Sequence, residues 1–143
     1  MKSKKIYPNI ENCNPSMCIS MKVSRLGRMT ANIYRKYLSP FGVTDSQLTL
    51  LFIISKVGGL TQKEISEMIK LEKSTLTRNL KRLIENKYIH KDNYPIIGIT
   101  DAGMLLLDDI VPEWDKAMAE IRSIIMDDGE DALDLILNKF QPR

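Results

Sequence analysis

The sequence predicts a mainly α-helical fold with a small β-hairpin wing: a winged helix-turn-helix between N- and C-terminal dimerisation helices. Two short helical segments are separated by a tight break at residues 70–72. Two β-prone runs follow them, at residues 88–91 and 96–99, around a polar break. Two helices, a tight turn and a hairpin make up this supersecondary motif. A chain of 143 residues suits one compact domain, or one domain with an oligomerising extension.

The first long helix is expected over residues 16–39, after an arm at residues 1–15 with little regular structure. Apolar side chains recur in this helix at near-helical spacing. They are Met17, Met21, Leu26, Met29, Ile33 and Tyr37. Pro40 ends the helix, because the residue before a proline avoids the helical region.

Capping boxes mark the start of the next two helices. Thr44 with Gln47, and Thr61 with Glu64, have the spacing at which two side chains satisfy free backbone N–H groups. The first box opens a helix that is apolar nearly all round, so we expect it to be central and buried. The second opens a short helix whose inward residues are expected to be Ile65, Met68 and Ile69.

A further helix is expected over residues 73–86, with two distinct faces. Leu76, Leu80, Leu83 and Ile84 fall on one face at helical spacing. The opposite face is polar and basic. Its members are Ser74, Thr75, Arg78, Lys81 and Arg82.

After the hairpin, Thr100 is expected to cap a long helix that runs to about Met126. Pro112 lies inside it and should bend it or mark a break. A turn is expected at residues 127–129, followed by a last amphipathic helix over residues 130–140.

Charge is distributed unevenly along the chain. Residues 1–60 carry a net +7, residues 61–100 carry +3, and residues 101–143 carry −7. This asymmetry is typical of a protein with one surface that meets a polyanion, although a chance distribution of solvated charges remains an alternative. The basic N-terminus has no apolar signal core behind it, and no apolar run approaches a membrane span, so we expect a cytoplasmic protein without membrane contact.

The second helix of such a motif can lie in the DNA major groove. Six basic residues and one acidic residue lie between Lys73 and Lys91. Arginines grip guanine edges or phosphates bidentately, and hydroxyls near a helix N-terminus suit phosphate. A solvated helix face would explain any one of these side chains, but their combination with the two-helix spacing favours DNA contact. The candidate DNA-binding residues are Gln62, Lys73, Ser74, Thr75, Thr77, Arg78, Asn79, Lys81, Arg82 and Lys91.

Several of these motifs resemble the MarR (multiple antibiotic resistance regulator) family. The similar stretches are LTQKEISEMIKLEKSTLTRNLKRLIENKYI, the preceding VTDSQLTLLFII and the later IGITDAGMLLL. The resemblance runs from about Cys18 to Phe140. It implies a homodimer in which residues 16–40 and 101–143 form the dimerisation region, and residues 41–100 form the DNA-binding lobe.

The same resemblance implies a transcriptional regulator that reads a palindromic operator in double-stranded DNA, as a repressor released by a small-molecule effector. The apolar C-terminal helices indicate a partner face independently of the resemblance. An effector pocket would lie between the dimer core and the lobe. Its candidate lining residues are Met21, Tyr34, Tyr37, Phe52 and Trp114.

The sequence departs from the family pattern in two places. The wing is short and holds no arginine, so we expect at most a phosphate contact from Lys91. Lys70 holds the place of a frequent glycine in the turn, where a left-handed backbone would cost free energy.

Two alternatives to this function stay open. One is a winged-helix module that binds another protein and no DNA; the other is a redox-sensing regulator that uses Cys18 or Cys13. Thiols need an electropositive setting to become reactive, and Lys22 is only a weak indication of one. We expect no enzyme, no cofactor and no metal site, because His90 is the only histidine and stands far from both cysteines.

Overall fold

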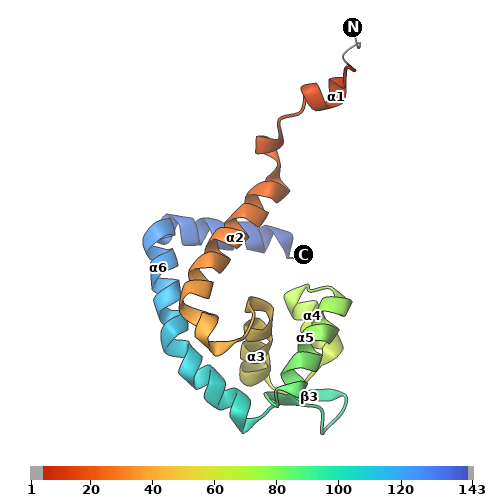
Figure 1. Cartoon of the computed structure of the whole chain (residues 1–143), viewed down its shortest axis with the longest axis vertical. Helices are drawn as coiled ribbons and strands as arrows, with labels where there is room; N and C mark the ends of the chain where they lie inside the picture. Colours follow the sequence, from red (N-terminus) through yellow and green to blue (C-terminus); the bar gives the residue numbers. More distant parts are fainter. Residues whose placement is uncertain (1–4, 142–143) are drawn as a thin grey trace.

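The fold is built from helices joined by a small three-stranded sheet (Figure 1). The structure, a computed structural model, describes residues 5–141. In chain order the elements are α1 (Pro8–Glu11), the 3-10 turn η1 (Pro15–Met17), α2 (Ile19–Leu38), the 3-10 turn η2 (Ser39–Phe41), α3 (Asp45–Val57), β1 (Leu60–Thr61), α4 (Gln62–Ile69), α5 (Lys73–Glu85), β2 (Ile89–His90), β3 (Ile96–Ile99) and α6 (Asp101–Phe140). The predicted mainly helical winged helix-turn-helix fold is confirmed.

Local side-chain caps mark where α3 and α4 begin. Thr44 accepts from the Gln47 backbone N–H, and the Gln47 side chain accepts from the Thr44 backbone N–H, at 3.2 and 3.1 Å. Thr61 and Glu64 form the same reciprocal box at the start of α4. Both predicted capping boxes are present, so α3 and α4 begin where the sequence indicated.

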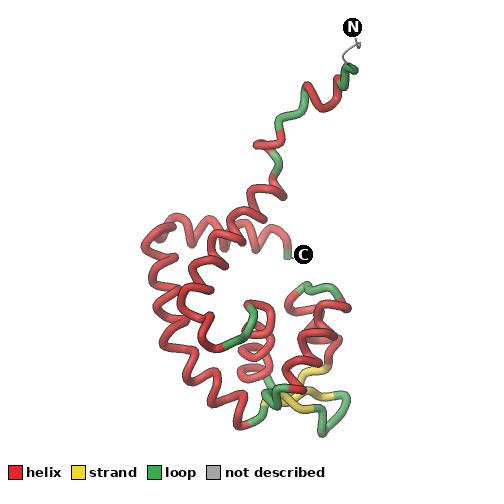
Figure 2. The backbone as a smooth tube through the Cα atoms, in the orientation of Figure 1, coloured by secondary structure: helices red, strands yellow, loops and turns green. Residues whose placement is uncertain are grey.

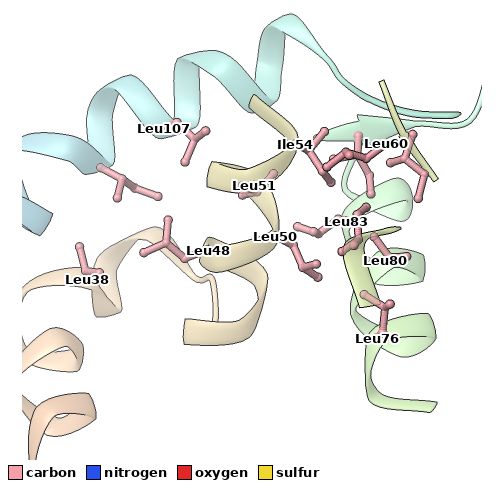
Figure 3. Close-up of a cluster of buried hydrophobic side chains, with 14 residues drawn as sticks. Leu38, Leu48, Leu50, Leu51, Ile54, Leu60, Leu76, Leu80, Leu83 and Leu107 are labelled. Atoms are coloured by element: carbon pink, nitrogen blue, oxygen red, sulfur yellow. The ribbon is translucent and has the colours of Figure 1, made fainter. Parts of the chain in front are cut away.

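The hydrophobic core is centred on α3. Leu50 and Leu51 are fully buried, and α5 turns Leu76, Leu80 and Leu83 toward them (Figure 3). The helix α3 carries apolar side chains on several of its sides. It therefore packs against α5, the sheet and α6 at the same time.

The sheet joins the wing to the start of the helix-turn-helix. Its order is β1-β3-β2, with both pairs antiparallel (Figure 2). The hairpin was predicted from its two β-prone runs; the structure adds its register, in which Ile89 lies opposite Ile99. The third strand, β1, was missed; it pairs Leu60 with Ile97 and so fixes the wing against the residues that enter α4.

The helix α2 lies beside α6 over part of its length, while its N-terminal half and residues 5–18 project away (Figure 1). Lys36 and Tyr37 both bind the Glu120 carboxylate. The Tyr34 hydroxyl donates to the Met118 sulfur at 2.7 Å. These contacts attach α2 to the middle of α6.

The C-terminal helices differ in detail from the prediction. The helical backbone continues through Pro112, so this residue does not mark a break. The predicted turn at 127–129 is instead a kink at Met126, whose φ is 57° and ψ is −177°. Asp127 and Asp128 therefore lie in the first turn after the kink, where negative charge favours a helix N-terminus.

Two smaller expectations also need correction. The arm contains one turn of α-helix and one 3-10 turn, although none of their residues is buried; its residues 1–4 lie outside the described part of the chain. Met68 is 50% exposed, because it lies on the outer side of the short helix α4. No helix between residues 5 and 141 is both long and apolar enough to cross a membrane.

Candidate nucleic-acid interface

A tight turn connects α4 to α5. Lys70 caps α4 in the left-handed conformation, with φ 53° and ψ 33°, and its N–H donates to the Ser66 carbonyl. The Gln62 side-chain amide donates to the Thr77 hydroxyl at 2.9 Å, which joins the first turn of α4 to α5. The Thr77 hydroxyl in turn donates to the Lys73 carbonyl. The two helices are therefore connected both by the turn and by the hydrogen bond between Gln62 and Thr77.

One face of α5 is held in the core, and the other is left to solvent. The buried side holds Leu76, Leu80 and Leu83. The exposed candidate DNA-binding residues of α5 are Lys73, Ser74, Thr77, Arg78, Lys81 and Arg82. The predicted polar and basic face is thus a continuous side of one rigid helix, with Thr75 half-buried at its edge.

Asn79 is the candidate that the structure places in the interior. Its side chain is 7% exposed, and it lies on the same side of α5 as Leu76 and Leu83. It is three residues after Leu76 and four before Leu83, which is the spacing of one helix face. A buried amide on the inner face is not available to bind DNA in this conformation.

Positive charge dominates the exposed face. Among residues 5–141, no acidic side chain comes within 4 Å of the guanidinium of Arg78 or Arg82. The acidic residue of α5, Glu85, is 3.9 Å from Lys81 through two exposed side chains. Such a pair gains little in water, so the face keeps its positive potential.

The wing offers one exposed lysine and one exposed aromatic side chain. Lys91 directly follows β2 and is exposed, as the sequence predicted. Tyr94 is 80% exposed near the tip of the hairpin and was not among the predicted site residues. The Nδ1 atom of His90 lies 3.4 Å from an oxygen of Asp92, inside the hairpin.

The wing is fastened to the start of α6 by Thr100. Its hydroxyl donates to the Lys87 carbonyl at 2.6 Å, and its backbone N–H donates to the Tyr88 carbonyl at 3.0 Å. Gly103 packs directly against the Tyr88 carbonyl, leaving no room for a Cβ atom. This junction connects the lobe rigidly to the long helix.

A cavity of about 200 Å³ lies where α2, α3 and α6 meet. Three of the five predicted effector-pocket residues line it: Tyr34, Phe52 and Trp114. Met21 lines a different, more basic depression near the start of α2, and Tyr37 binds Glu120 outside the cavity wall.

The prediction missed three residues of the cavity wall, all from α3: Asp45, Leu48 and Thr49. With Phe52 they recur at the spacing of one helix face, so helical periodicity could have found them. The Phe52 and Trp114 ring centroids are 5.4 Å apart, with an angle of 53° between the planes.

The two cysteines lie outside both features. Cys13 and Cys18 are exposed free thiols near the start of α2. Between residues 5 and 141, no group of three or more histidine, cysteine or acidic side chains is arranged to hold a metal ion.

Comparison with known proteins agrees with this architecture. The sequence profile of the MarR family matches residues 41–93, which span α3, the helix-turn-helix and the first part of the wing. A helix-turn-helix transcriptional regulator of Bacillus subtilis, YwoH, is 34% identical over 70 residues. That match covers 49% of this chain and 51% of YwoH, so the chain spans about half the length of this relative.

Solved structures extend the similarity over most of the chain. The transcriptional regulator MosR of M. tuberculosis, in complex with DNA, matches 83% of this chain and 94% of its own, with a TM-score of 0.71 and 26% identity. The part of the chain that matches the MarR family profile is residues 41–93, which hold the helix-turn-helix. The repressor CouR, bound to p-coumaroyl-CoA, matches 86% of this chain and 91% of its own, with a TM-score of 0.76 and 17% identity. The chain thus carries the fold of MarR family transcriptional regulators.

Proposed function

We propose that this chain is a dimeric, sequence-specific DNA-binding transcriptional regulator. In this proposal α5 reads the major groove of a palindromic operator, and a small molecule releases a repressor from that operator. The DNA-binding residues would be those of the exposed face of α5, together with Gln62 and Lys91. Asn79 is left out because it is buried.

The observation that carries the proposal is the exposed face of α5. Arg78 and Arg82 project from a helix whose other side is fixed by fully buried leucines. A guanidinium held on a rigid support can meet guanine O6 and N7, or a phosphate, in a defined register. The complex of MosR with DNA supports the assignment, since its fold and much of its length match this chain.

Apolar surface outside the lobe supports the dimer. In the part of the chain that the structure describes, all but three of the exposed large hydrophobic side chains lie outside residues 41–100. The exceptions are Val57, Met68 and Tyr94. Exposed apolar surface of this extent marks an interaction site, and a two-fold pair would cover it while directing two copies of α5 to one face.

The ligand-release step is supported by the cavity at the junction of α2, α3 and α6. A molecule bound there would contact the lobe through α3 and the proposed dimerisation region through α2 and α6. CouR, which has this fold, is bound to a small organic ligand. A ligand can shift DNA affinity only if it binds one arrangement of these helices more tightly than another.

Selection of bound DNA from a random pool tests the function directly. The expected outcome is enrichment of one inverted-repeat sequence. Binding to that sequence should weaken steeply as salt is raised, because each phosphate contact releases counterions. A pool that shows no enrichment over repeated rounds would contradict the proposal.

The short wing favours a second candidate function, a winged-helix module that binds another protein. Without an arginine, the hairpin lacks the side chain best suited to enter a minor groove. The same selection experiment separates the two functions, since a protein-binding module gives no salt-sensitive, sequence-dependent DNA binding.

A further inference from the structure

The cavity where α2, α3 and α6 meet has aromatic walls and an acidic rim. Three aromatic side chains and Leu48 line it. Leu48 also belongs to the buried cluster that contains Leu38 and Leu107 (Figure 3). Asp45 is exposed, lies in the first turn of α3, and is the only acidic residue of the wall. The wall contains no basic residue.

The oxygen atoms of the wall are arranged as hydrogen-bond acceptors. The Thr49 hydroxyl donates its proton to the Asp45 backbone carbonyl at 2.9 Å. The Tyr34 hydroxyl donates to the Met118 sulfur, and burial raises the pKa of Tyr34, so this hydroxyl keeps its proton. Both hydroxyl protons are therefore already used, and the Asp45 carboxylate has none.

The positive charge of Arg122, which lies near Tyr34, is compensated by Glu130. Arg122 is close enough to lower the pKa of Tyr34, although less than burial raises it. Its guanidinium binds the Glu130 carboxylate through Nε and a terminal nitrogen, at 3.0 to 3.3 Å. Arg122 does not line the cavity, so an anionic ligand would find no free cation in the wall and would meet Asp45.

From this chemistry we propose that the cavity binds a small organic cation: an apolar or aromatic body with a protonated amine. The body lies against Phe52 and Trp114, and the ammonium group reaches Asp45. Aromatic faces attract cations, and a charge-assisted hydrogen bond to a carboxylate is stronger than a neutral one. The proposal rests on the proposed function in one respect, because it names the chemical class of the small molecule in the ligand-release step.

The size of the cavity limits the ligand. A volume of about 200 Å³ is below the range of ~300–1,000 Å³ usual for drug-sized ligands. A single ring with a short aminoalkyl group fits this size.

Trp114 provides the readout, because it is the only tryptophan of the chain and lies in the cavity wall. Its fluorescence is titrated in the full chain with three probes of one shape: benzylammonium, benzyl alcohol and benzoate. We expect saturable binding in the order benzylammonium, benzyl alcohol, benzoate. Benzoate binding as tightly as benzylammonium, or no probe changing the emission, would overturn the proposal.

Two matched variants locate the charge. Asp45→Asn should weaken benzylammonium binding roughly tenfold, the loss of one charge-assisted hydrogen bond, and leave benzyl alcohol nearly unchanged. Asp101→Asn removes an exposed acidic side chain from the first turn of α6, outside the cavity, and should change neither. Equal effects of the two substitutions would contradict a contact at Asp45. Circular dichroism checks that both variants are folded.

DNA binding, measured separately, distinguishes this proposal from the proposed function. If selected DNA binds and benzylammonium does not, the cation site is wrong and the DNA-binding function stands. If benzylammonium binds in an Asp45-dependent way and no DNA sequence is enriched, the cation site stands and the regulator function is wrong.

Discussion

Lys70 adopts a backbone conformation that glycine reaches at lower cost. Its φ of 53° is left-handed, and a Cβ atom is strained there. Lys70→Gly should therefore raise the free energy of unfolding by roughly 0.5–1 kcal/mol, measured by urea denaturation. Lys70→Ala keeps the Cβ atom and serves as the control. A gain from alanine as large as that from glycine would show that the left-handed backbone is not the cause.

Gly103 has the opposite sensitivity, because a Cβ atom there would collide with the Tyr88 carbonyl. We expect Gly103→Ala to lower the free energy of unfolding by at least ~2 kcal/mol, since the atom nearest to the added Cβ would be a backbone oxygen, which cannot move without the adjoining strand. Thermal unfolding gives the measurement.

Gly27→Ala is the matched control. Gly27 lies inside α2, and no atom lies within 4 Å of the added Cβ. Alanine should therefore stabilise the chain by up to ~1 kcal/mol.

Among the elements, the contact between α2 and α6 makes stability depend on pH. The hydrogen bond from Tyr37, together with Lys36, lowers the pKa of Glu120 below its usual range. A carboxyl with a lowered folded-state pKa stabilises the fold above its unfolded pKa and loses that contribution as pH falls through the folded value. We expect stability to fall on acidification from about pH 5, the upper end of the glutamate titration.

Glu120→Gln isolates this contribution. The variant should be less stable than the parent at neutral pH, and the difference between the two should shrink as pH falls below about 4. Urea unfolding at a series of pH values measures it. Glu113 makes an exposed ion pair with Lys116 on α6 alone, so Glu113→Gln is a control that should show a smaller change. A constant difference between Glu120→Gln and the parent at every pH would contradict the assignment.

Under the proposed function, α5 and the wing should differ in their contribution to DNA binding. Arg78→Ala should weaken binding to the selected sequence by ~1–3 kcal/mol and relax specificity at one position. Lys91→Ala should weaken binding less, and equally for all sequences, because a wing lysine reaches only phosphate. Fluorescence anisotropy on matched and altered DNA gives both values.

Arg35→Ala is the control for this comparison, since Arg35 is an exposed arginine on α2 whose side chain donates a hydrogen bond to Asn32 of the same helix. It should leave DNA affinity unchanged. If Lys91→Ala cost as much as Arg78→Ala, the short wing would be an equal contributor, and the division of roles would be wrong.

Elements with local start signals were predictable from the sequence. The capping boxes at Thr44 and Thr61 depend on residues three positions apart, so they can be recognised without any tertiary contact. The strand β1 could not be found in this way, because two residues carry no periodicity and Leu60 becomes a strand only by pairing with Ile97. The kink at Met126 likewise has no local breaker at its own position.

The candidate site was only partly predictable for similar reasons. Helical spacing identified the exposed face of α5 and, applied consistently, would have placed Asn79 inside with the leucines. The aromatic residues of the cavity were named through resemblance. The position of Asp45 in the cavity wall was missed because an acidic residue after a cap is usually read as a helix-start signal alone.

At the scale of the whole molecule, one copy leaves much apolar surface uncovered. The N-terminal half of α2 and the segment after the kink in α6 expose large apolar side chains, while the lobe buries most of its own. The parts of the chain that contain these segments also differ in charge: residues 1–60, which include α2, carry +7, and residues 101–143, which include α6, carry −7. A second copy can cover the apolar surface, and opposite charges on the two segments favour their association.

Ile136→Glu tests this arrangement. Ile136 is 50% exposed in the single chain, so a charged side chain there need not disturb folding, but it would be buried in a dimer that uses the C-terminal segment. Met68→Glu is the matched control, because Met68 is also 50% exposed but lies in the lobe. Light scattering after size-exclusion chromatography should give a dimer for the parent and Met68→Glu, and a monomer for Ile136→Glu.

The monomer should also lose affinity for the inverted repeat, since only a two-fold pair can place two copies of α5 about 34–36 Å apart on one face of DNA. A parent chain that runs as a monomer, or an Ile136→Glu variant that stays dimeric, would contradict the C-terminal dimer contact.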